Sequence, residues 1–181
     1  MKRGSSKRVA AGAALFLLLL VVLILASRVL DPQGGTRPSR ETPVPFFSGV
    51  EAEVVKVVDG DTLDVEAEDA RGKRVRERVR MLRIDTPERE ERGYREATRA
   101  LARMVEDKRV RLEGEAGGRF ERGNYGRVLA YVFADGKNVN VEMVRLGWTP
   151  FWTRFGEGRF AEAFREAEKE AKRARRGLWR R

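Results

Sequence analysis

The sequence predicts an α+β domain, a small five-stranded barrel with three helices, behind one N-terminal transmembrane or signal helix. Three features predict this class: β-branched segments within 54–84 and 110–133, amphipathic helical segments between and after them, and an uncharged apolar run near the N-terminus. The length of 181 residues suits one domain of ordinary size plus a tail or anchor.

The first residues of the chain have the pattern of an export signal. Residues 1–8 form a basic cytoplasmic n-region, and residues 9–26 contain no charged side chain. At ~1.5 Å per helical residue this run spans roughly 27 Å, close to the ~30 Å hydrocarbon core of a bilayer. Cleavage after Ala26 or Ser27 would put Ile24 or Leu25 where signal peptidase prefers a small residue. We therefore expect an uncleaved signal anchor, with a cleaved signal peptide as the alternative.

The same signal predicts where the rest of the chain lies. Basic residues before the apolar run keep the N-terminus in the cytoplasm. We expect a protein held in the cell membrane through residues 9–26, with its domain outside the cytoplasm, or a secreted protein if the signal is cleaved. Residues 27–50 are expected to form a flexible linker because prolines and glycines interrupt regular structure there, and residues 51–181 to form the domain.

The first part of the domain is expected to form strands. Val54–Val58 is β-branched, Asp59-Gly60 is a strong hairpin signal, and Thr62–Glu66 alternates again. Arg74–Ile84 predicts a long third strand. Val110–Glu113 and Val128–Phe133 predict two more.

Three helices are expected around and after these strands. Residues 94–106 place Ala97, Leu101, Met104 and Val105 on one stripe. A short helix over 138–146 ends at Gly147. The last helix covers about 158–176, with Phe160, Phe164, Ala167, Ala171 and Ala174 on its apolar side. Strands and helices in this order fit an OB-type barrel.

The composition excludes several classes of site. The chain has no Cys and no His, which removes disulfides, zinc sites built on Cys or His, thiol nucleophiles and imidazole triads. A base would have to be a carboxylate, Lys or Tyr, and a metal would be a hard cation such as Ca²⁺ or Mg²⁺. The formal charge of +10 favours polyanions, but from Glu51 onward 31 Lys and Arg face 26 Asp and Glu, so the domain is only mildly basic.

Two short segments contain an unusual density of carboxylates. They are Asp59-Gly60-Asp61-Thr62 and Asp85-Thr86-Pro87-Glu88. Alone, the first is an ordinary turn and the second a turn or helix start. Together, Asp61 and Asp85 lie at opposite ends of paired strands, which can bring two carboxylates to one end of a barrel and suits Ca²⁺.

Two arginines accompany the carboxylates. Arg80 shares strand parity with Leu82 and Ile84, so its guanidinium needs an anionic partner; the alternative is an ion pair with Glu53 or Glu66 across the sheet. Arg127 follows a turn at Asn124-Tyr125-Gly126, and its alternative is an ordinary loop arginine.

Residues 52–179 resemble the staphylococcal nuclease family, over about 70% of the chain. The matching segments are Val58–Thr62, Arg80 five residues before Asp85–Glu88, Tyr125–Arg127 with Leu129–Tyr131, Ala134–Lys137 with Val139-Asn140, Val144-Arg145, and Leu178-Trp179.

The resemblance implies an OB-fold, monomeric, Ca²⁺-dependent phosphodiesterase acting on DNA and RNA, with single strands favoured and 3′-phosphate products. It implies that Asp61, Asp85 and the Thr86 carbonyl bind Ca²⁺, that Glu88 is the general base or orients the attacking water, and that Arg80 and Arg127 hold the scissile phosphate. Asp59 would support the metal ligands. Tyr125 and Asn124 would contact substrate, although Asn124 stands where well-known members have a lysine.

Three features leave alternatives open. The loop after Glu88 is shorter than in the family. The aromatic residues Trp148, Phe151, Trp152 and Phe155 are either core or a surface for bases. The C-terminal Lys and Arg residues are either a solvated helix face or a contact for nucleic acid or membrane. The predicted function is therefore an exported nuclease, with a non-catalytic nucleic-acid-binding barrel or an envelope scaffold as alternatives.

Overall fold

The computed structural model describes residues 48–180. The chain divides into two compact units, and the second, Pro43–Arg181, contains all of these residues. The expected export signal lies outside them, as does most of the expected linker. Within 48–180, no helix is long and apolar enough to cross a membrane.

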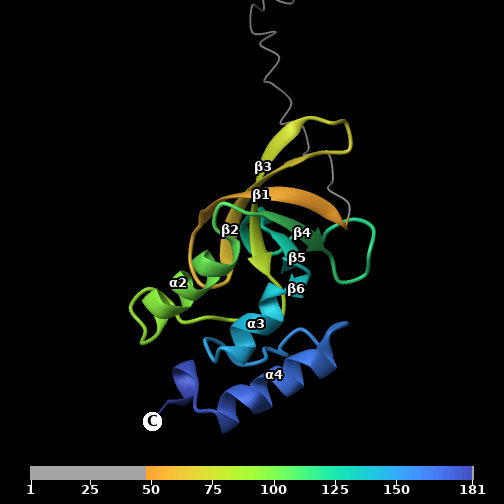
Figure 1. Cartoon of the computed structure of the whole chain (residues 1–181). Coiled ribbons are helices and arrows are strands. Elements are labelled where there is room, and N and C mark those ends of the chain that lie inside the picture. The colour runs from red at the N-terminus through yellow and green to blue at the C-terminus, as the bar shows by residue number, and fades with distance from the viewer. Residues whose placement is uncertain (1–47, 181) are drawn as a thin grey trace, which may run out of the picture. The chain divides into compact units, whose positions relative to one another are not determined.

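Five strands close into a barrel, and a short sixth strand extends its sheet (Figure 1). The order is β3-β2-β1-β4-β5-β6, and an additional parallel pairing of β3 with β5 closes the ring. This is the OB-type barrel that the sequence predicts. The strands are β1 Val50–Val57, β2 Thr62–Glu68, β3 Arg74–Met81, β4 Arg109–Glu113, β5 Val128–Ala134 and β6 Lys137–Asn138.

The hairpin of β1 and β2 positions the first carboxylate segment. The two strands pair antiparallel from Ala52 with Ala67 to Val57 with Leu63, and their register shifts between Val54 and Lys56. A bulge of this kind bends and twists a strand, which helps a sheet to close. Asp59 and Asp61 therefore lie in the turn at one end of the barrel.

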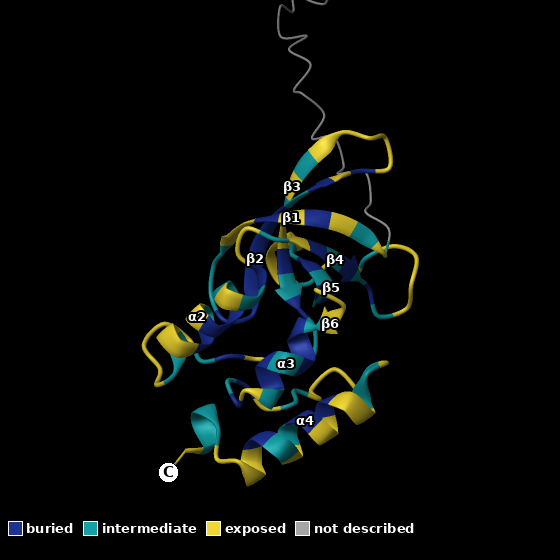
Figure 2. Ribbon diagram, viewed as in Figure 1, coloured by how far each residue is buried: buried dark blue, intermediate teal, exposed yellow. Residues whose placement is uncertain are grey.

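The helices α2 Tyr94–Val105, α3 Val139–Arg145 and α4 Ala161–Arg173 confirm the three expected helices. Figure 2 shows α2 and α4 with a buried stripe and an exposed outer face. Ala97, Leu101 and Val105 form the stripe of α2, as the spacing predicts. In α4 the buried residues are Phe164, Ala167 and Ala171.

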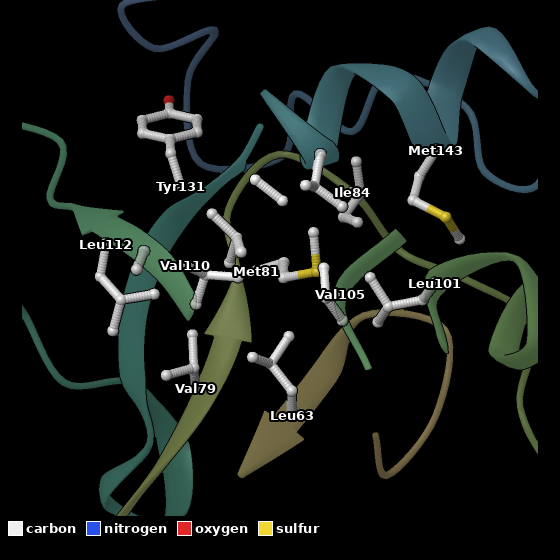
Figure 3. Close-up of a cluster of buried hydrophobic side chains, with 14 of the residues drawn as sticks. Leu63, Val79, Met81, Ile84, Leu101, Val105, Val110, Leu112, Tyr131 and Met143 are labelled. Atoms are coloured by element: carbon white, nitrogen blue, oxygen red, sulfur yellow. The ribbon is translucent and has the colours of Figure 1, made fainter. Parts of the chain in front are cut away.

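The interior of the barrel is filled by side chains from strands and helices. Figure 3 shows Leu63 of β2, Met81 of β3 and Val105 of α2 pointing into one cluster, in which each is at most 1% exposed. Because α2 packs on strands that carry the candidate site, packing fixes the segment between β3 and α2, where Asp85 and Glu88 lie.

Three local features differ from the sequence prediction. The third strand ends at Met81 rather than Ile84, because Arg83 has a φ of 63°, which interrupts an extended chain. The short strand β6 was not expected. Two single 3₁₀ turns, Asn124–Gly126 and Gly177–Trp179, complete the described elements.

Candidate active site

A pocket of about 530 Å³ brings together most of the residues predicted from the sequence. It opens at the end of the barrel where the β1–β2 turn, the end of β3 and the start of β5 meet. The predicted residues that line it are Asp59, Asp61, Arg80, Asp85, Glu88, Asn124 and Arg127.

Asp61 is the most tightly held of these residues. Its Oδ2 accepts hydrogen bonds from the backbone N–H and the hydroxyl of Thr86, at 2.8 and 2.9 Å. Its Oδ1 accepts one from the Thr62 hydroxyl at 3.0 Å. Thr86 does not line the pocket but is buried beside it. These bonds join the two carboxylate segments directly, so Asp61 and Asp85 lie at one end of the barrel as expected.

Arg80 lies between the two aspartates and is only 13% exposed. Its Nε is 3.2 Å from Asp61 Oδ1, and its Nη2 is 2.8 Å from Asp85 Oδ1. Its Nη1 donates to the carbonyls of Met81 and Ile84, both at 2.8 Å. The alternative pairing with Glu53 or Glu66 is wrong, because Arg74 makes those ion pairs. A guanidinium held at all three nitrogens has a fixed orientation toward the pocket.

Asp85 is held through its backbone by a residue that the sequence analysis missed. The fully buried Thr149 hydroxyl accepts from the Asp85 N–H at 2.9 Å and lies 2.9 Å from the Asp85 carbonyl oxygen. No motif marks Thr149, since it acts across 64 residues of sequence.

Glu88 and Arg127 present unengaged groups to the pocket. The Glu88 N–H donates to Glu91 Oε2 at 2.8 Å, but no hydrogen bond or ion pair within residues 48–180 engages the Glu88 carboxylate. Arg127 donates from Nε to the Asn124 carbonyl at 3.2 Å. Among the described residues, its two terminal nitrogens have no acceptor. A free carboxylate and a free guanidinium fork suit a water molecule and a phosphate, respectively.

Tyr125 lies outside this pocket. It is 96% exposed and lines an adjoining hollow with Arg78 and Arg127. The Arg127 guanidinium carbon is 5.8 Å from the centre of its ring.

The pocket perturbs the acidity of its aspartates. Burial raises the pKa of the Asp59 carboxyl above its usual range, and the neighbouring charge of Asp61 raises it further. Burial also raises the pKa of Asp85, since the Arg80 guanidinium offsets only part of it and Asp61 adds to it. In both carboxyls burial is the larger cause of the raised pKa, and the negative charge of Asp61 is the smaller one.

A family model described as "Staphylococcal nuclease homologue" matches residues 78–181, which is more than half of the chain. The chain belongs to the staphylococcal nuclease family. The matched residues include Arg80, Asp85, Thr86, Glu88 and Arg127.

Curated relatives give the same family. An "Uncharacterized endonuclease" of Escherichia coli is 33% identical over 131 residues, covering 72% of this chain and 77% of the relative. The "Micrococcal nuclease" of Shigella flexneri is 32% identical over 145 residues, covering 75% and 77%. The "Thermonuclease" of Staphylococcus hyicus is 28% identical over 132 residues, covering 70% and 73%.

The charge of the pocket decides whether a cation fits this member of the staphylococcal nuclease family. Six carboxylate residues and three arginines line the pocket, which is a formal charge of −3. A phosphodiester is itself an anion, so this pocket repels it without an added cation. The available donors are all oxygen, which suits Ca²⁺. Within residues 48–180 no three acidic side chains are placed to hold a metal, so a cation would take two carboxylates and complete its shell with carbonyl or water oxygens.

The sequence analysis missed part of the pocket wall. Arg83, Glu115 and Glu121 line it, and neither parity nor a motif marked them. Of the four aromatic residues from Trp148 to Phe155, two belong to the core and two line the pocket. Phe151 stacks on Phe164 at 4.9 Å in the core, and Trp148 packs on that core, whereas Trp152 and Phe155 line the pocket.

Proposed function

We propose that this protein is a Ca²⁺-dependent nuclease that hydrolyses phosphodiester bonds of DNA and RNA and leaves 3′-phosphates. The observation that carries the proposal is the convergence of Arg80, Arg127 and an unengaged Glu88 around Asp61 and Asp85 in one pocket. Its family and the names of its relatives support a nuclease, which is a hydrolase.

In this proposal the arginines bind and orient the phosphate. Arg80 is fixed by Asp61, Asp85 and two carbonyls, so its orientation costs nothing when substrate binds. Arg127 brings a guanidinium whose terminal nitrogens are available. Two guanidinium groups match the additional negative charge that develops on the phosphorus oxygens during attack.

Glu88 is the proposed proton acceptor. Its carboxylate has no partner within residues 48–180, so it can accept a proton from a water molecule or orient that water toward phosphorus. Ca²⁺ would be held by Asp61, Asp85 and the Thr86 carbonyl, and it would supply Lewis-acid polarisation of a phosphate oxygen and a more acidic water. Asp59 would support this site through its negative charge and by accepting a hydrogen bond from the Asp61 N–H at 3.0 Å.

Location and form of the protein are part of the proposal. The basic n-region and the uncharged run at 9–26 support a membrane-anchored protein whose nuclease domain is outside the cytoplasm, or a secreted one after cleavage. We propose that it acts as a monomer, because one chain supplies the whole pocket.

A cleavage assay tests the function. The full chain is incubated with a fluorogenic single-stranded oligonucleotide in Ca²⁺, in Mg²⁺ and in EGTA. We expect cleavage in Ca²⁺ that EGTA stops. Arg80→Gln, Arg127→Gln and Glu88→Gln should each lower kcat by about 10²–10³-fold. The control Arg99→Gln, on the exposed face of α2, should keep full activity.

The outcomes separate the two leading functions. A folded protein that binds the oligonucleotide but does not cleave it would contradict the nuclease and favour the non-catalytic binding barrel. Wild-type turnover in any of the three pocket variants would remove that residue from the mechanism.

A further inference from the structure

A half-buried ion pair connects β3 to the turn that carries Arg127. Glu77 lies on the face of β3 that includes the buried Val79 and Met81, because side chains alternate along a strand. The Glu77 side chain is only 12% exposed, so its charge needs a partner. Arg122 is this partner: its Nη1 donates to Glu77 Oε2 at 2.9 Å, and its Nη2 donates to Glu77 Oε1 at 2.8 Å. Two parallel bonds of this kind fix both the position and the plane of a guanidinium.

Arg122 also contacts the turn itself. Its Nη1 donates to the Gly126 carbonyl at 2.7 Å, and its backbone forms a β-bridge with Val128 at the start of β5. The same guanidinium therefore bonds to β3 on one side and to the residue just before Arg127 on the other. Arg122 does not line the pocket, so these contacts lie outside the surface that a substrate would touch.

The turn has a backbone conformation that needs support. Tyr125 and Gly126 have positive φ values of 62° and 72°. Local hydrogen bonds close the turn, from the Gly126 N–H to the Gly123 carbonyl at 3.1 Å and from the Gly123 N–H to the Arg127 carbonyl at 2.9 Å. A bulky residue is unfavourable in the left-handed region and stays there where surrounding contacts hold it. The bond from Arg122 to Gly126 is such a contact, and it joins the turn to the barrel.

Arg127 depends on this turn for its orientation. Within residues 48–180 its side chain donates one hydrogen bond, from Nε to the Asn124 carbonyl at 3.2 Å, and Asn124 belongs to the turn. The Arg127 guanidinium carbon also lies 5.8 Å from the ring centre of Tyr125, in the same turn. Arg80 differs, because two carboxylates and two carbonyls hold its three nitrogens. A shift of the turn would therefore move the guanidinium of Arg127 and leave that of Arg80 in place.

We propose that Arg122 is a positioning residue for Arg127, acting through its ion pair with Glu77 and its hydrogen bond to the Gly126 carbonyl. The inference rests on the proposed function, in which Arg127 binds the scissile phosphate. It extends that function to a residue outside the pocket, on which turnover depends through Arg127. A displacement of about 1 Å in a group that positions substrate can lower the rate roughly 10²-fold.

A double-mutant cycle on turnover tests this role. The full chain is assayed with the fluorogenic oligonucleotide in Ca²⁺, well below the Tm of every variant. Arg122→Gln should lower kcat about 10- to 100-fold, because Arg127 no longer meets the charge that develops during attack. In an Arg127→Gln background the same change should alter kcat less than about twofold, because the residue that Arg122 positions is gone. A merely structural role would lower kcat by the same factor in both backgrounds.

Two further variants keep the test decisive if Arg122→Gln folds poorly. Arg122→Lys keeps a charge beside Glu77 but cannot form both parallel bonds, so its kcat should lie between those of wild type and Arg122→Gln. Arg145→Gln is the matched control. The Arg145 side chain is 33% exposed, against 35% for Arg122, and it pairs with Glu142 and Glu170 in α3 and α4. This control should leave kcat unchanged, whatever it does to the Tm.

An NMR measurement reports the position of Arg127 without any cleavage. The ¹H–¹⁵N signal of the Arg127 Nε–H, assigned as the signal lost in Arg127→Lys, senses the hydrogen bond to Asn124. Arg122→Gln should move this signal toward the position of a solvent-exposed arginine. Arg145→Gln should leave it in place.

An unmoved signal in Arg122→Gln, or an equal loss of kcat in both backgrounds, would overturn the inference. The two measurements also separate this failure from failure of the function. Wild-type cleavage with an unmoved signal rejects the positioning role alone. A signal that moves in a protein that does not cleave rejects the nuclease and keeps the role of Arg122 in holding Arg127.

Discussion

At the scale of single residues, the candidate site depends on how closely two backbone segments approach. Asp61 accepts hydrogen bonds from Thr86, so the turn after β1 and the segment after β3 must be in contact. Gly60 makes this approach possible. It is buried, and a Cβ built on it would lie 2.7 Å from Thr86 Oγ1 and 2.8 Å from Ala97 Cβ. Its φ is not in the positive region, so the need for glycine here is steric.

Replacing Gly60 with alanine should therefore separate the two segments. We expect Gly60→Ala to lower the free energy of unfolding by about 1–3 kcal/mol, which is the usual cost of overpacking a core. It should also lower nuclease activity, because Thr86 is displaced from Asp61. Urea denaturation and the oligonucleotide assay measure the two effects. Gly114→Ala is the control, since its Cβ would meet Phe120 at 3.4 Å, an ordinary contact; equal losses in both variants would contradict this account.

At the scale of elements, Arg83 ties the end of β3 to two other segments, through a half-buried ion pair with Glu115 just after β4 and through hydrogen bonds to the segment before α4. Arg83 Nη2 is 2.6 Å from Glu115 Oε2, and Arg83 Nη1 donates to the carbonyls of Phe155 and Gly156 at 2.6 and 2.9 Å. The Tyr131 hydroxyl of β5 donates to the same Glu115 oxygen at 2.7 Å. This network holds Phe155 on the pocket wall, and it explains why Arg83 keeps a left-handed backbone.

Glu115→Gln should weaken this tie and do so in a pH-dependent way. Burial opposes the charge of Glu115, but the hydrogen bonds from Tyr131 and Arg83 outweigh it and lower the pKa of the carboxyl. A lowered pKa gives stability that is present above the ordinary carboxylate pKa and is lost as the pH falls through the lowered value. We expect the free energy of unfolding of Glu115→Gln to be about 1–3 kcal/mol lower at neutral pH, because Arg83 loses its charged partner.

The difference in the free energy of unfolding between wild type and Glu115→Gln should then become smaller in acid. Urea midpoints at neutral pH and at a pH below the carboxylate range measure it. A constant difference at both pH values would show that the charge of Glu115 does not stabilise the fold.

The sequence predicts elements well where the signal is local. The stripe of α2, the hairpin at Asp59-Gly60 and the helix ending before Gly147 all depend on neighbours in the chain, and the structure confirms them. The strand β6 follows Asp135-Gly136, whose φ values of 50° and 74° are those of a tight hairpin turn, so a local signal for it existed.

The prediction fails where distant segments decide the structure. Arg83 ends β3 early because its partners lie 32 to 73 residues away. Thr149 was missed for the same reason, because its contact with Asp85 spans 64 residues of sequence. The predicted pocket residues were found from short motifs and a family resemblance. The residues that support them, such as Arg83 and Thr149, belong to no motif and could not be found in this way.

At the scale of the whole domain, the last residues connect the helices to the candidate site. The Leu178 N–H donates to the Gly147 carbonyl at 2.8 Å, just after α3. The Leu178 side chain packs on Gly93, so closely that a Cβ there would lie 2.7 Å from it. Gly93 precedes α2 and ends the segment that carries Glu88. The 3₁₀ turn Gly177–Trp179 therefore supports two helices and, through one of them, the segment that carries Glu88.

Removing this turn should destabilise the domain more than its size suggests. A chain ending at Arg176 lacks the partly buried side chains of Leu178 and Trp179. We expect its free energy of unfolding to fall by about 2 kcal/mol. For a chain of this length that lowers Tm by about 5 °C. Activity should fall as well, below the Tm, because the segment carrying Glu88 loses its support at Gly93. A chain ending at Trp179 keeps the turn. It loses the exposed Arg180, whose carbonyl accepts one exposed hydrogen bond from Arg92 at 3.2 Å, so its Tm and activity should stay close to those of the full chain. If both truncated chains melt together with the full chain, the turn is no brace, and the packing of α2 on the barrel alone holds Glu88 in place.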